Sequence, residues 1–228
     1  MSKRISIISL AICGLAAIAV AQSTNRFLPK QGDTWAFRQK VTTEMAGTTI
    51  IYTSKMANRV LETSEKGFKV EITESEGMLD MGGGEEPQGD ASTSTVRYGA
   101  RGEVLTVDGQ AMADNPVRFA SLFNFIYPEA ELAKGLKWEY SVKANKELGT
   151  YDTTYKYEVL EPATVNGVAT FKVKFSMEEK ATDLPGSNVG TVWLDAKTAR
   201  PIKAESKFTN ASIQGMAFSG SWELSPAN

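Results

Sequence analysis

The sequence predicts a mainly β protein, in which an antiparallel sheet forms a curved sheet, a barrel or a sandwich. Three observations support this fold class. Long stretches alternate apolar and polar residues with a period of two, as half-buried strands do. Glycine-containing turn signals separate these stretches at the spacing of β-hairpins. One stretch, near residues 115–126, combines helical spacing of apolar residues with a capping signal, which predicts a single short helix.

The first residues have the features of a secretory signal peptide. Met1-Ser2-Lys3-Arg4 carries two positive charges, an apolar run follows from Ile5 to Val20, and Ala19-Val20-Ala21 precedes Gln22. A basic start, an apolar middle and an A-x-A end are typical of such leaders. The apolar run is about 16 residues, shorter than the roughly 20 that a membrane-spanning helix needs. We therefore expect a signal helix in residues 1–21, cleaved between Ala21 and Gln22.

Two alternatives to a cleaved leader are a transmembrane anchor and a lipoprotein signal. Cys13 is the only cysteine. Ile12 precedes it where a lipoprotein signal carries Gly, Ala or Ser, and apolar sequence continues beyond it. We therefore expect a secreted or periplasmic protein with no membrane span after cleavage. Because the mature chain then has no cysteine, its stability must come from its core rather than from disulfides.

The charge balance argues against a nucleic-acid partner. The chain has 25 basic and 27 acidic residues, and the leader removes Lys3 and Arg4. The mature net charge is therefore about −4, with no basic block to bind phosphate. The same charge gives no attraction to anionic membranes.

The first β region is expected to span residues 22–113. Trp35, Phe37, Gln39 and Val41 share one face of a strand by their period of two. Further along, the pattern predicts a break at Ala46-Gly47, a strand over 48–52, a strand at 60–62, a turn at 65–67 and a strand over 68–72.

The segment Glu74 to Ser94 is acidic, glycine-rich and poor in apolar residues, so we expect a mobile surface loop. Its acids are Glu74, Glu76, Asp80, Glu85, Glu86 and Asp90. Carboxylates of this kind are calcium ligands in other proteins. Their spacing does not fit a calcium-binding loop, so a solvated acidic loop is the better interpretation.

The predicted helix lies in a helix and linker segment, residues 114–134. Asp114 or Asn115 can cap it and Pro116 fits its first turn. Its apolar residues are Val117, Phe119, Ala120, Leu122, Phe123 and Phe125, and we expect them to pack onto the sheet.

The second β region, residues 135–228, repeats the pattern. Strands are expected at 138–142, 151–159 and 171–175, with a tight turn at Asn166-Gly167. A closing hairpin is expected from Lys203 to Leu224, with its turn near Asn210.

Matching residues suggest that one unit of roughly 100 residues occurs twice within one domain. Gly32-x-x-Trp35 matches Gly135-x-x-Trp138, and Phe68-Lys69-Val70 matches Phe171-Lys172-Val173 at the same offset of 103 positions. Val60 matches Val159 and Val96 matches Val192 at slightly smaller offsets. Two separate β domains are the alternative. Two copies are too few for a solenoid.

The residue types exclude several classes of chemistry. The chain has no histidine, which rules out Ser-His-Asp and Cys-His catalysis and, with no mature cysteine, the usual zinc sites. No G-x-S-x-G, phosphate-binding loop or G-x-G-x-x-G sequence is present. We single out no catalytic, metal-binding or cofactor-binding residue and expect no cofactor. Paired carboxylates for a hydrolase remain conceivable, without a specific candidate pair.

The four tryptophans, Trp35, Trp138, Trp193 and Trp222, each begin or join a predicted strand. We expect them in the core. The alternative is that some line a cavity for an apolar ligand.

Several of these motifs resemble secreted bacterial families of unknown function. They are the Gly-x-x-Trp units, Val165-Asn166-Gly167-Val168, and the stretch Gly190 to Pro201 with its Trp-x-Asp and Arg-Pro. Such families are similar in build to the lipoprotein-carrier fold, a half-barrel sheet with helix cover, which implies an envelope setting and transfers no catalytic residue. The carrier fold has several helices, whereas this sequence predicts one.

Three hypotheses for function follow. The first is a non-catalytic secreted or periplasmic protein that binds an apolar, lipid-like molecule or another envelope component. The second is a structural or interaction module of the cell envelope. The third, least supported, is a carboxylate-based hydrolase.

Overall fold

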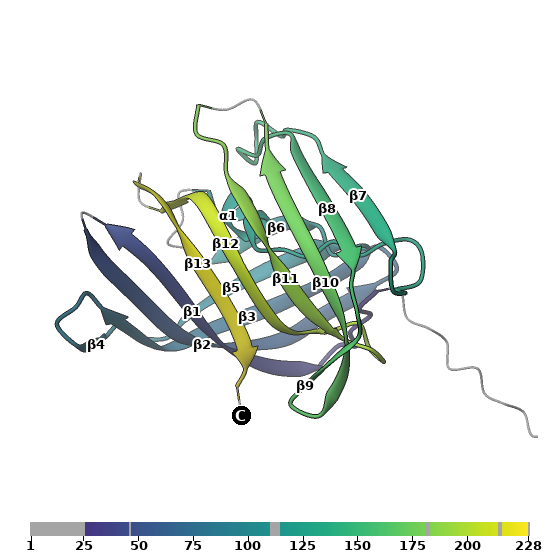
Figure 1. Ribbon diagram of the computed structural model, residues 1–228, viewed down its shortest axis with the longest axis horizontal. Helices are drawn as coiled ribbons and strands as arrows, with labels where there is room; N and C mark the ends of the chain where they lie inside the picture. Colours follow the sequence, from purple (N-terminus) through teal and green to yellow (C-terminus); the bar gives the residue numbers. More distant parts are fainter. Residues whose placement is uncertain (1–25, 46, 110–114, 181–182, 214–215, 228) are drawn as a thin grey trace, which may run out of the picture.

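In the computed structural model, residues 26–45, 47–109, 115–180, 183–213 and 216–227 are described. They form one large antiparallel sheet with a short helix on one of its faces (Figure 1). The expected leader, residues 1–21, and Asp114 lie outside the described residues. Within these ranges, no helix is long and apolar enough to cross a membrane.

The predicted fold class is confirmed: the protein is mainly β, and the curved sheet is not closed into a barrel. The elements are β1 (Thr34–Met45), β2 (Thr48–Ser64), β3 (Gly67–Asp80), β4 (Glu85–Pro87), β5 (Ser92–Gly99), β6 (Val104–Gly109), α1 (Pro116–Leu122), β7 (Lys137–Val142), β8 (Thr153–Val159), β9 (Ala163–Val165), β10 (Val168–Glu179), β11 (Ser187–Asp195), β12 (Pro201–Ile213) and β13 (Met216–Pro226). Their order across the sheet is β6-β5-β3-β2-β1-β13-β12-β11-β10-β8-β7, with β4 beside β3 and β9 beside β10.

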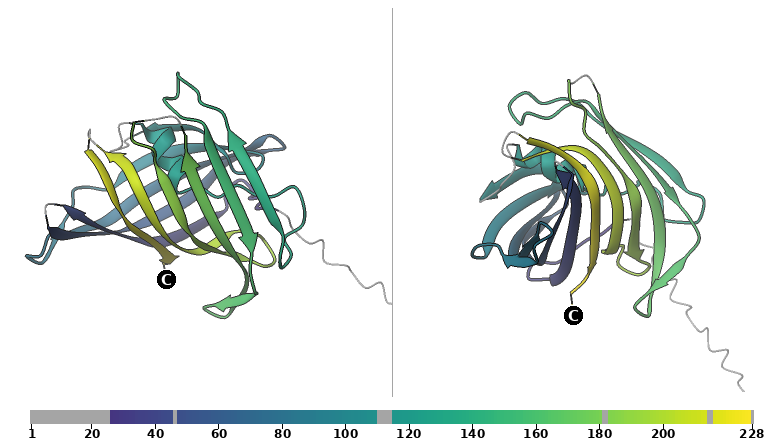
Figure 2. Two further views of the ribbon diagram at one scale, coloured as in Figure 1. Left: turned by 45° about the horizontal axis from the view of Figure 1, so that its top comes forward. Right: turned by 60° about the vertical axis from the view of Figure 1, so that its left-hand side comes forward.

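The first and last strands meet in the middle of the sheet, where β1 pairs with β13. The edges are therefore β6 and β7, the two strands that flank α1 in the sequence. Between them the chain crosses the inner, concave face of the sheet, which bends around α1 (Figure 2). Near one end the edges are linked directly, because the Tyr140 hydroxyl on β7 donates to Glu103 Oε1 beside β6 at 3.0 Å.

Residues that match between the two halves of the sequence make equivalent backbone contacts. Gly32 N–H donates to the carbonyl of Val60 at 2.9 Å, and Gly135 N–H donates to that of Val159 at 2.8 Å. Both glycines have positive φ, which suits residues without a Cβ. Duplication of one unit explains this agreement and stays a prediction.

The same agreement extends across the strands of each half. Val60 pairs with Val70 and Val70 with Val96; Val159 pairs with Val173 and Val173 with Val192. All six side chains are buried.

Helix α1 begins where the sequence predicts, and it ends several residues before its predicted end. The Asn115 side chain accepts a hydrogen bond from Arg118 N–H at 2.8 Å, with Pro116 in the first turn. The helix ends at Leu122 rather than near residue 126. Phe123 and Phe125 continue inward in non-helical chain, because packing among aromatic rings outweighs helix propensity there: the Phe123 ring lies 5.3 Å from Phe208, and the Phe125 ring 5.0 Å from Tyr157.

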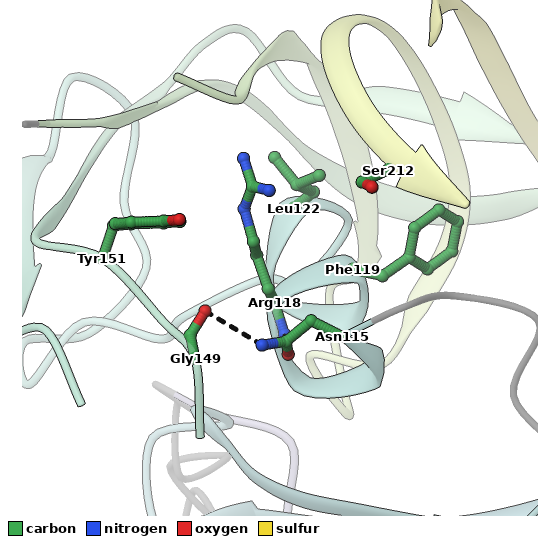
Figure 3. A pocket seen from close by; sticks show the side chains of 7 residues that line it. All are labelled: Asn115, Arg118, Phe119, Leu122, Gly149, Tyr151 and Ser212. Carbon is green, nitrogen blue, oxygen red and sulfur yellow. Dashed lines mark hydrogen bonds between the residues drawn. The ribbon is translucent and has the colours of Figure 1, made fainter. Parts of the chain in front are cut away.

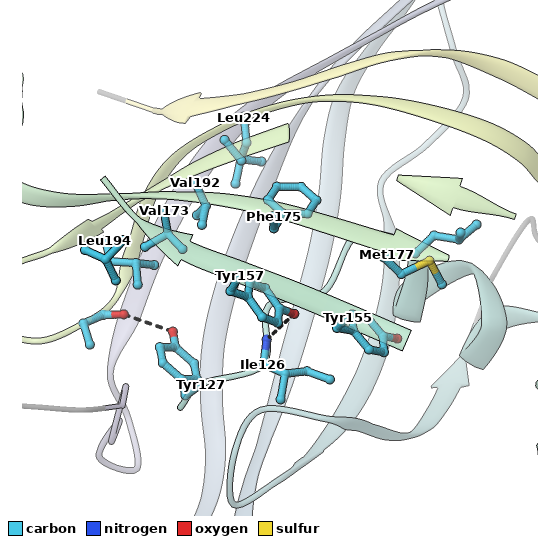
Figure 4. Packing of buried hydrophobic residues seen from close by; sticks show 14 of the residues in the cluster. Ile126, Tyr127, Tyr155, Tyr157, Val173, Phe175, Met177, Val192, Leu194 and Leu224 are labelled. Carbon is cyan, nitrogen blue, oxygen red and sulfur yellow. Dashed lines mark hydrogen bonds between the residues drawn. The ribbon is translucent and has the colours of Figure 1, made fainter. Parts of the chain in front are cut away.

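The chain after α1 fills the inner face of the second half of the sheet. Tyr157 OH accepts a hydrogen bond from Ile126 N–H at 3.1 Å, and Tyr127 OH donates to the Ala199 carbonyl at 3.0 Å (Figure 4). Trp138 Nε1 donates to the Ile126 carbonyl at 3.0 Å. These bonds satisfy the polar ends of large rings whose bodies form the core.

Two expectations about strands and loops are wrong. The segment 74–94 is not a single loop: β3 continues to Asp80, and β4 and β5 follow. The strand continues because β2 is long enough to pair with it as far as Asp80 and because Arg38 and Lys55 bind Glu76 on its outer face.

The hairpin turn expected near Asn210 is a bulge inside β12. Asn210 has a φ of 54°, and the register with β13 shifts between Phe208 and Ala211 before the strand continues to Ile213. Positive φ at an Asn suits a bulge as well as a turn, so the sequence alone does not separate the two. By contrast, Asn166-Gly167 forms the predicted tight turn, with φ of 48° and 79°.

Candidate functional site

The inner face of the sheet is unevenly covered. In the second half, inward side chains such as Tyr157, Met177 and Leu194 are at most 4% exposed. In the first half, and on β13 where it pairs with β1, several inward side chains towards the β1–β2 turn are only half-buried. We call this region the open inner patch and define it by Gln39, Val41, Tyr52, Met56, Glu74 and Trp222.

Register places these residues side by side on three neighbouring strands. Val41 of β1 lies between Tyr52 of β2 and Trp222 of β13. One pair further along the strands, Gln39 lies between Ser54 and Leu224. Because side chains alternate along a strand, both rows face the same side of the sheet. That side is the inner one, since the Trp222 ring lies 5.3 Å from Phe123 at the end of α1.

A carboxylate is the centre of the patch. Glu74 Oε1 accepts hydrogen bonds from Gln39 Nε2 at 2.7 Å, Ser54 Oγ at 2.7 Å and Tyr52 OH at 2.9 Å. Gln39 Nε2 also donates to Ser54 Oγ at 2.8 Å, and Trp222 Nε1 donates to Gln39 Oε1 at 3.4 Å. The network fixes the Glu74 carboxylate through neutral donors alone.

The network also holds Tyr52 neutral. Burial, charge repulsion from the neighbouring Glu74 carboxylate and the hydrogen bond that Tyr52 donates to it together raise the pKa of Tyr52 to about 12. Tyr52 therefore remains a hydrogen-bond donor at any physiological pH.

A second polar cluster fastens α1 to the sheet beside a cavity of about 260 Å³ (Figure 3). Arg118 Nε and Nη2 donate to the two carboxylate oxygens of Glu179 at 2.8 and 2.7 Å. Nη2 also donates to the Leu184 carbonyl, and the guanidinium carbon lies 5.0 Å from the centre of the Tyr151 ring. Asn115 Nδ2 donates to the carbonyls of Leu148 and Gly149 at 2.7 and 2.9 Å.

This cluster stabilises the attachment of α1 to the sheet, and we call it the joint between α1 and the sheet. Hydrogen bonds to Glu179 raise the pKa of Arg118, and the Glu179 side chain is only 2% exposed. The bidentate pair uses both carboxylate oxygens. Its charges therefore cancel within the protein.

The tryptophans divide between the two faces of the sheet. Trp35, Trp138 and Trp222 are partly buried against the core, as expected. Trp193 is not in the core: it lies on the outer face between Lys172 and Lys203, whose Nζ atoms are 5.5 and 4.8 Å from the ring centre. Leu194, the next residue, takes the inward position with 0% exposure.

A shallower hollow of about 480 Å³ also involves the outer face. Its lining is mostly charged, with lysine and glutamate side chains from β7, β8 and β10. Such a mixture is ordinary for a solvated sheet face.

The acids of segment 74–94 do not gather into one site. Glu74 faces inward, whereas Glu76, two residues later, binds Arg38 at 2.8 Å on the outer face. The φ of 54° at Glu76 marks the irregularity that separates them. Among the residues that the structure describes, no group of three or more His, Cys, Asp or Glu is placed to hold a metal ion.

Sequence reasoning did not identify Glu74 and Gln39 as a pair. One signal was available: Gln39 is a polar residue in the middle of the apolar face formed by Trp35, Phe37 and Val41. A polar side chain there needs an inward partner. The sequence does not reveal which one, since Glu74 is 35 residues away.

Comparisons with known proteins identify no family. No family model matches the chain, and no curated protein matches it. Among solved structures, a protein of Parabacteroides distasonis described as a "putative lipoprotein" is 13% identical, with 88% of this chain and 96% of that chain covered and a TM-score of 0.33. A similarity at this level does not establish a shared fold or function.

Proposed function

We propose that this is a non-catalytic, exported protein that binds an apolar or amphiphilic small molecule on the open inner patch. The observation that carries the proposal is the contrast in cover across one continuous inner face. The protein's own segment, residues 115–136, covers the second half, and the corresponding part of the first half near the β1–β2 turn stays partly exposed.

The chemistry of the patch fits such a ligand. Val41, Met56, Tyr52 and Trp222 present aliphatic, thioether and aromatic surface. Ligand sites are commonly concave and mostly apolar, with a few fixed polar groups. The Glu74 network supplies such groups at a defined position. Export is supported by the leader sequence, residues 1–21.

An envelope interaction module is the second candidate, and a different observation favours it. Met45, Met81, Leu184 and Met216 are 41–56% exposed. Met45, Met81 and Leu184 lie at or just beyond the ends of β1, β3 and β10 in chain direction, and Met216 begins β13; the antiparallel order places these positions on one rim of the sheet. A group of exposed apolar side chains on one rim can form a contact surface.

A matched pair of variants tests the proposal. Val41→Gln changes the inner face, and Thr42→Gln changes the adjacent position on the outer face. The mature protein, residues 22–228, would be titrated with the neutral apolar dye N-phenyl-1-naphthylamine, whose fluorescence rises on binding. We expect saturable binding that Val41→Gln weakens about tenfold, because it places an amide among apolar groups, and that Thr42→Gln leaves unchanged.

Two results would contradict the proposal. One is the absence of saturable dye binding to the parent protein. The other is binding that both variants affect equally, and in that case rim variants such as Met45→Gln with Met216→Gln would locate it instead.

A further inference from the structure

We infer that the ligand of the open inner patch carries a primary ammonium group, and that Glu74 is the residue that binds it. This inference rests on the proposed function and adds the chemical class of the ligand. The experiment below separates failure of the inference from failure of the proposed function.

The hydrogen bonds at Glu74 are one-sided. Three donors, Gln39 Nε2, Ser54 Oγ and Tyr52 OH, converge on Oε1. Within the described part of the chain, no side chain or backbone group donates to Oε2. Three donors on one oxygen hold the carboxylate in a fixed orientation. The other oxygen keeps its lone pairs for a further donor.

The negative charge of Glu74 has no cationic partner among the described residues. The basic residues of β1, β2, β3 and β5 alternate onto the outer face: Arg38, Lys40, Lys55, Arg59, Lys69 and Arg97. Several are paired there, such as Arg38 with Glu76 and Arg59 with Glu71. Glu179, an inward carboxylate of the second half, has its own arginine. Glu103 uses both of its oxygens, for Tyr140 OH and Arg101 N–H. Among the described residues, Glu74 therefore combines contacts from neutral groups alone with an oxygen that accepts no hydrogen bond from the protein.

A cation would compensate for the hydration that a half-buried carboxylate loses on an apolar face. Aromatic rings near Glu74 also favour the binding of a cation at this position. Tyr52 and Trp222 flank Val41 on neighbouring strands, about 5 Å from it on either side. Ring faces attract ammonium groups. Because Oε2 can accept a hydrogen bond, which a quaternary ammonium cannot donate, the structure favours a primary ammonium over a quaternary one, with its alkyl chain along Val41 and Met56.

Three probes of equal chain length test this: octylamine, which is cationic at pH 7, octan-1-ol, which is neutral, and octanoate, which is anionic. Each would displace N-phenyl-1-naphthylamine from the mature protein. The variants are Glu74→Gln, which removes the inward charge, and Glu76→Gln, which removes the same charge two residues away on the outer face. Circular dichroism and thermal unfolding would confirm that both variants fold.

We expect octylamine to bind the parent protein about tenfold or more tightly than octan-1-ol, with octanoate weakest, since a hydrogen bond to a charged group contributes more than a neutral one. Glu74→Gln should remove the advantage of octylamine, and Glu76→Gln should preserve it. Equal displacement by all three probes would overturn the inference and leave the proposed function intact. Octylamine selectivity that survives in Glu74→Gln would also overturn it. No displacement by any probe would overturn the inference alone, whereas absence of saturable dye binding would overturn both.

Discussion

The joint between α1 and the sheet gives a quantitative prediction. Replacing Arg118 with Met leaves the Glu179 carboxylate buried, with a side-chain exposure of 2%. Among the described residues, its remaining donor is Gly186 N–H, at 2.6 Å. Removing one partner of a buried ion pair typically costs about 3–5 kcal/mol in the free energy of unfolding. We expect Arg118→Met to fall in that range.

The loss of stability comes from the buried Glu179 carboxylate that no longer has a cationic partner. Replacing this carboxylate with an amide should therefore restore part of the stability. In the double variant Arg118→Met/Glu179→Gln, the amide oxygen can still accept the Gly186 N–H. The double variant should therefore be more stable than the sum of the two single effects implies, by about 1–3 kcal/mol. Arg59→Met is the matched control, because the Arg59–Glu71 pair is exposed, and it should cost about 1 kcal/mol or less.

Urea unfolding of residues 22–228, followed by tryptophan fluorescence, measures the free energy of unfolding of Arg118→Met, Glu179→Gln, the double variant and Arg59→Met. The reasoning is refuted if Arg118→Met costs no more than Arg59→Met, or if the two substitutions at the joint are additive.

Three further predictions follow from the geometry. Leu194→Ala, at a fully buried position, should lower the free energy of unfolding by about 2–5 kcal/mol in the same urea assay. Val189→Ala lies on the same strand at a position that is 45% exposed, and it should lower the free energy of unfolding by about 0.5 kcal/mol or less. Gly190→Ala should destabilise the protein because its Cβ would collide with the backbone carbonyl of Glu205, whereas Gly83→Ala, with open space around it, should leave the unfolding midpoint unchanged. The pKa of Tyr52 is raised to about 12 from 10, so the folded state holds this proton longer than the unfolded state; stability from this group is complete below pH 10 and is lost as the pH rises towards 12. Burial also raises the pKa of Tyr98 to about 12, so absorbance at 295 nm should show a tyrosine transition near pH 12 whose amplitude Tyr52→Phe reduces. A loss of amplitude near pH 10 instead would contradict the network.

Local features of the fold could be predicted from the sequence. The alternation from Trp35 to Val41 gives β1 and its inward face. Asn166-Gly167 gives a hairpin turn, and Asn115-Pro116 gives the start of α1. Each of these depends on residues within a few positions of one another, which is the range over which backbone propensity and side-chain alternation act.

Features that depend on distant partners could not be predicted. Glu74 is in a strand because β2 pairs with β3, and it faces inward in register with Val70 and Ile72, whereas the bulge after it turns Glu76 outward. The carboxylate at the centre of the candidate site is therefore located in a segment whose composition indicates a loop. The position of Trp193 is a similar case, since Lys172 and Lys203 on neighbouring strands provide its surroundings.

The most direct test of the account is native mass spectrometry on the mature protein purified gently from its own host. The account predicts an additional mass that denaturation removes, that belongs to an apolar or amphiphilic molecule, and that is strongly reduced in Val41→Gln and retained in Thr42→Gln. A mass equal to that of the polypeptide alone, in the parent protein as in both variants, would contradict ligand binding at the open inner patch.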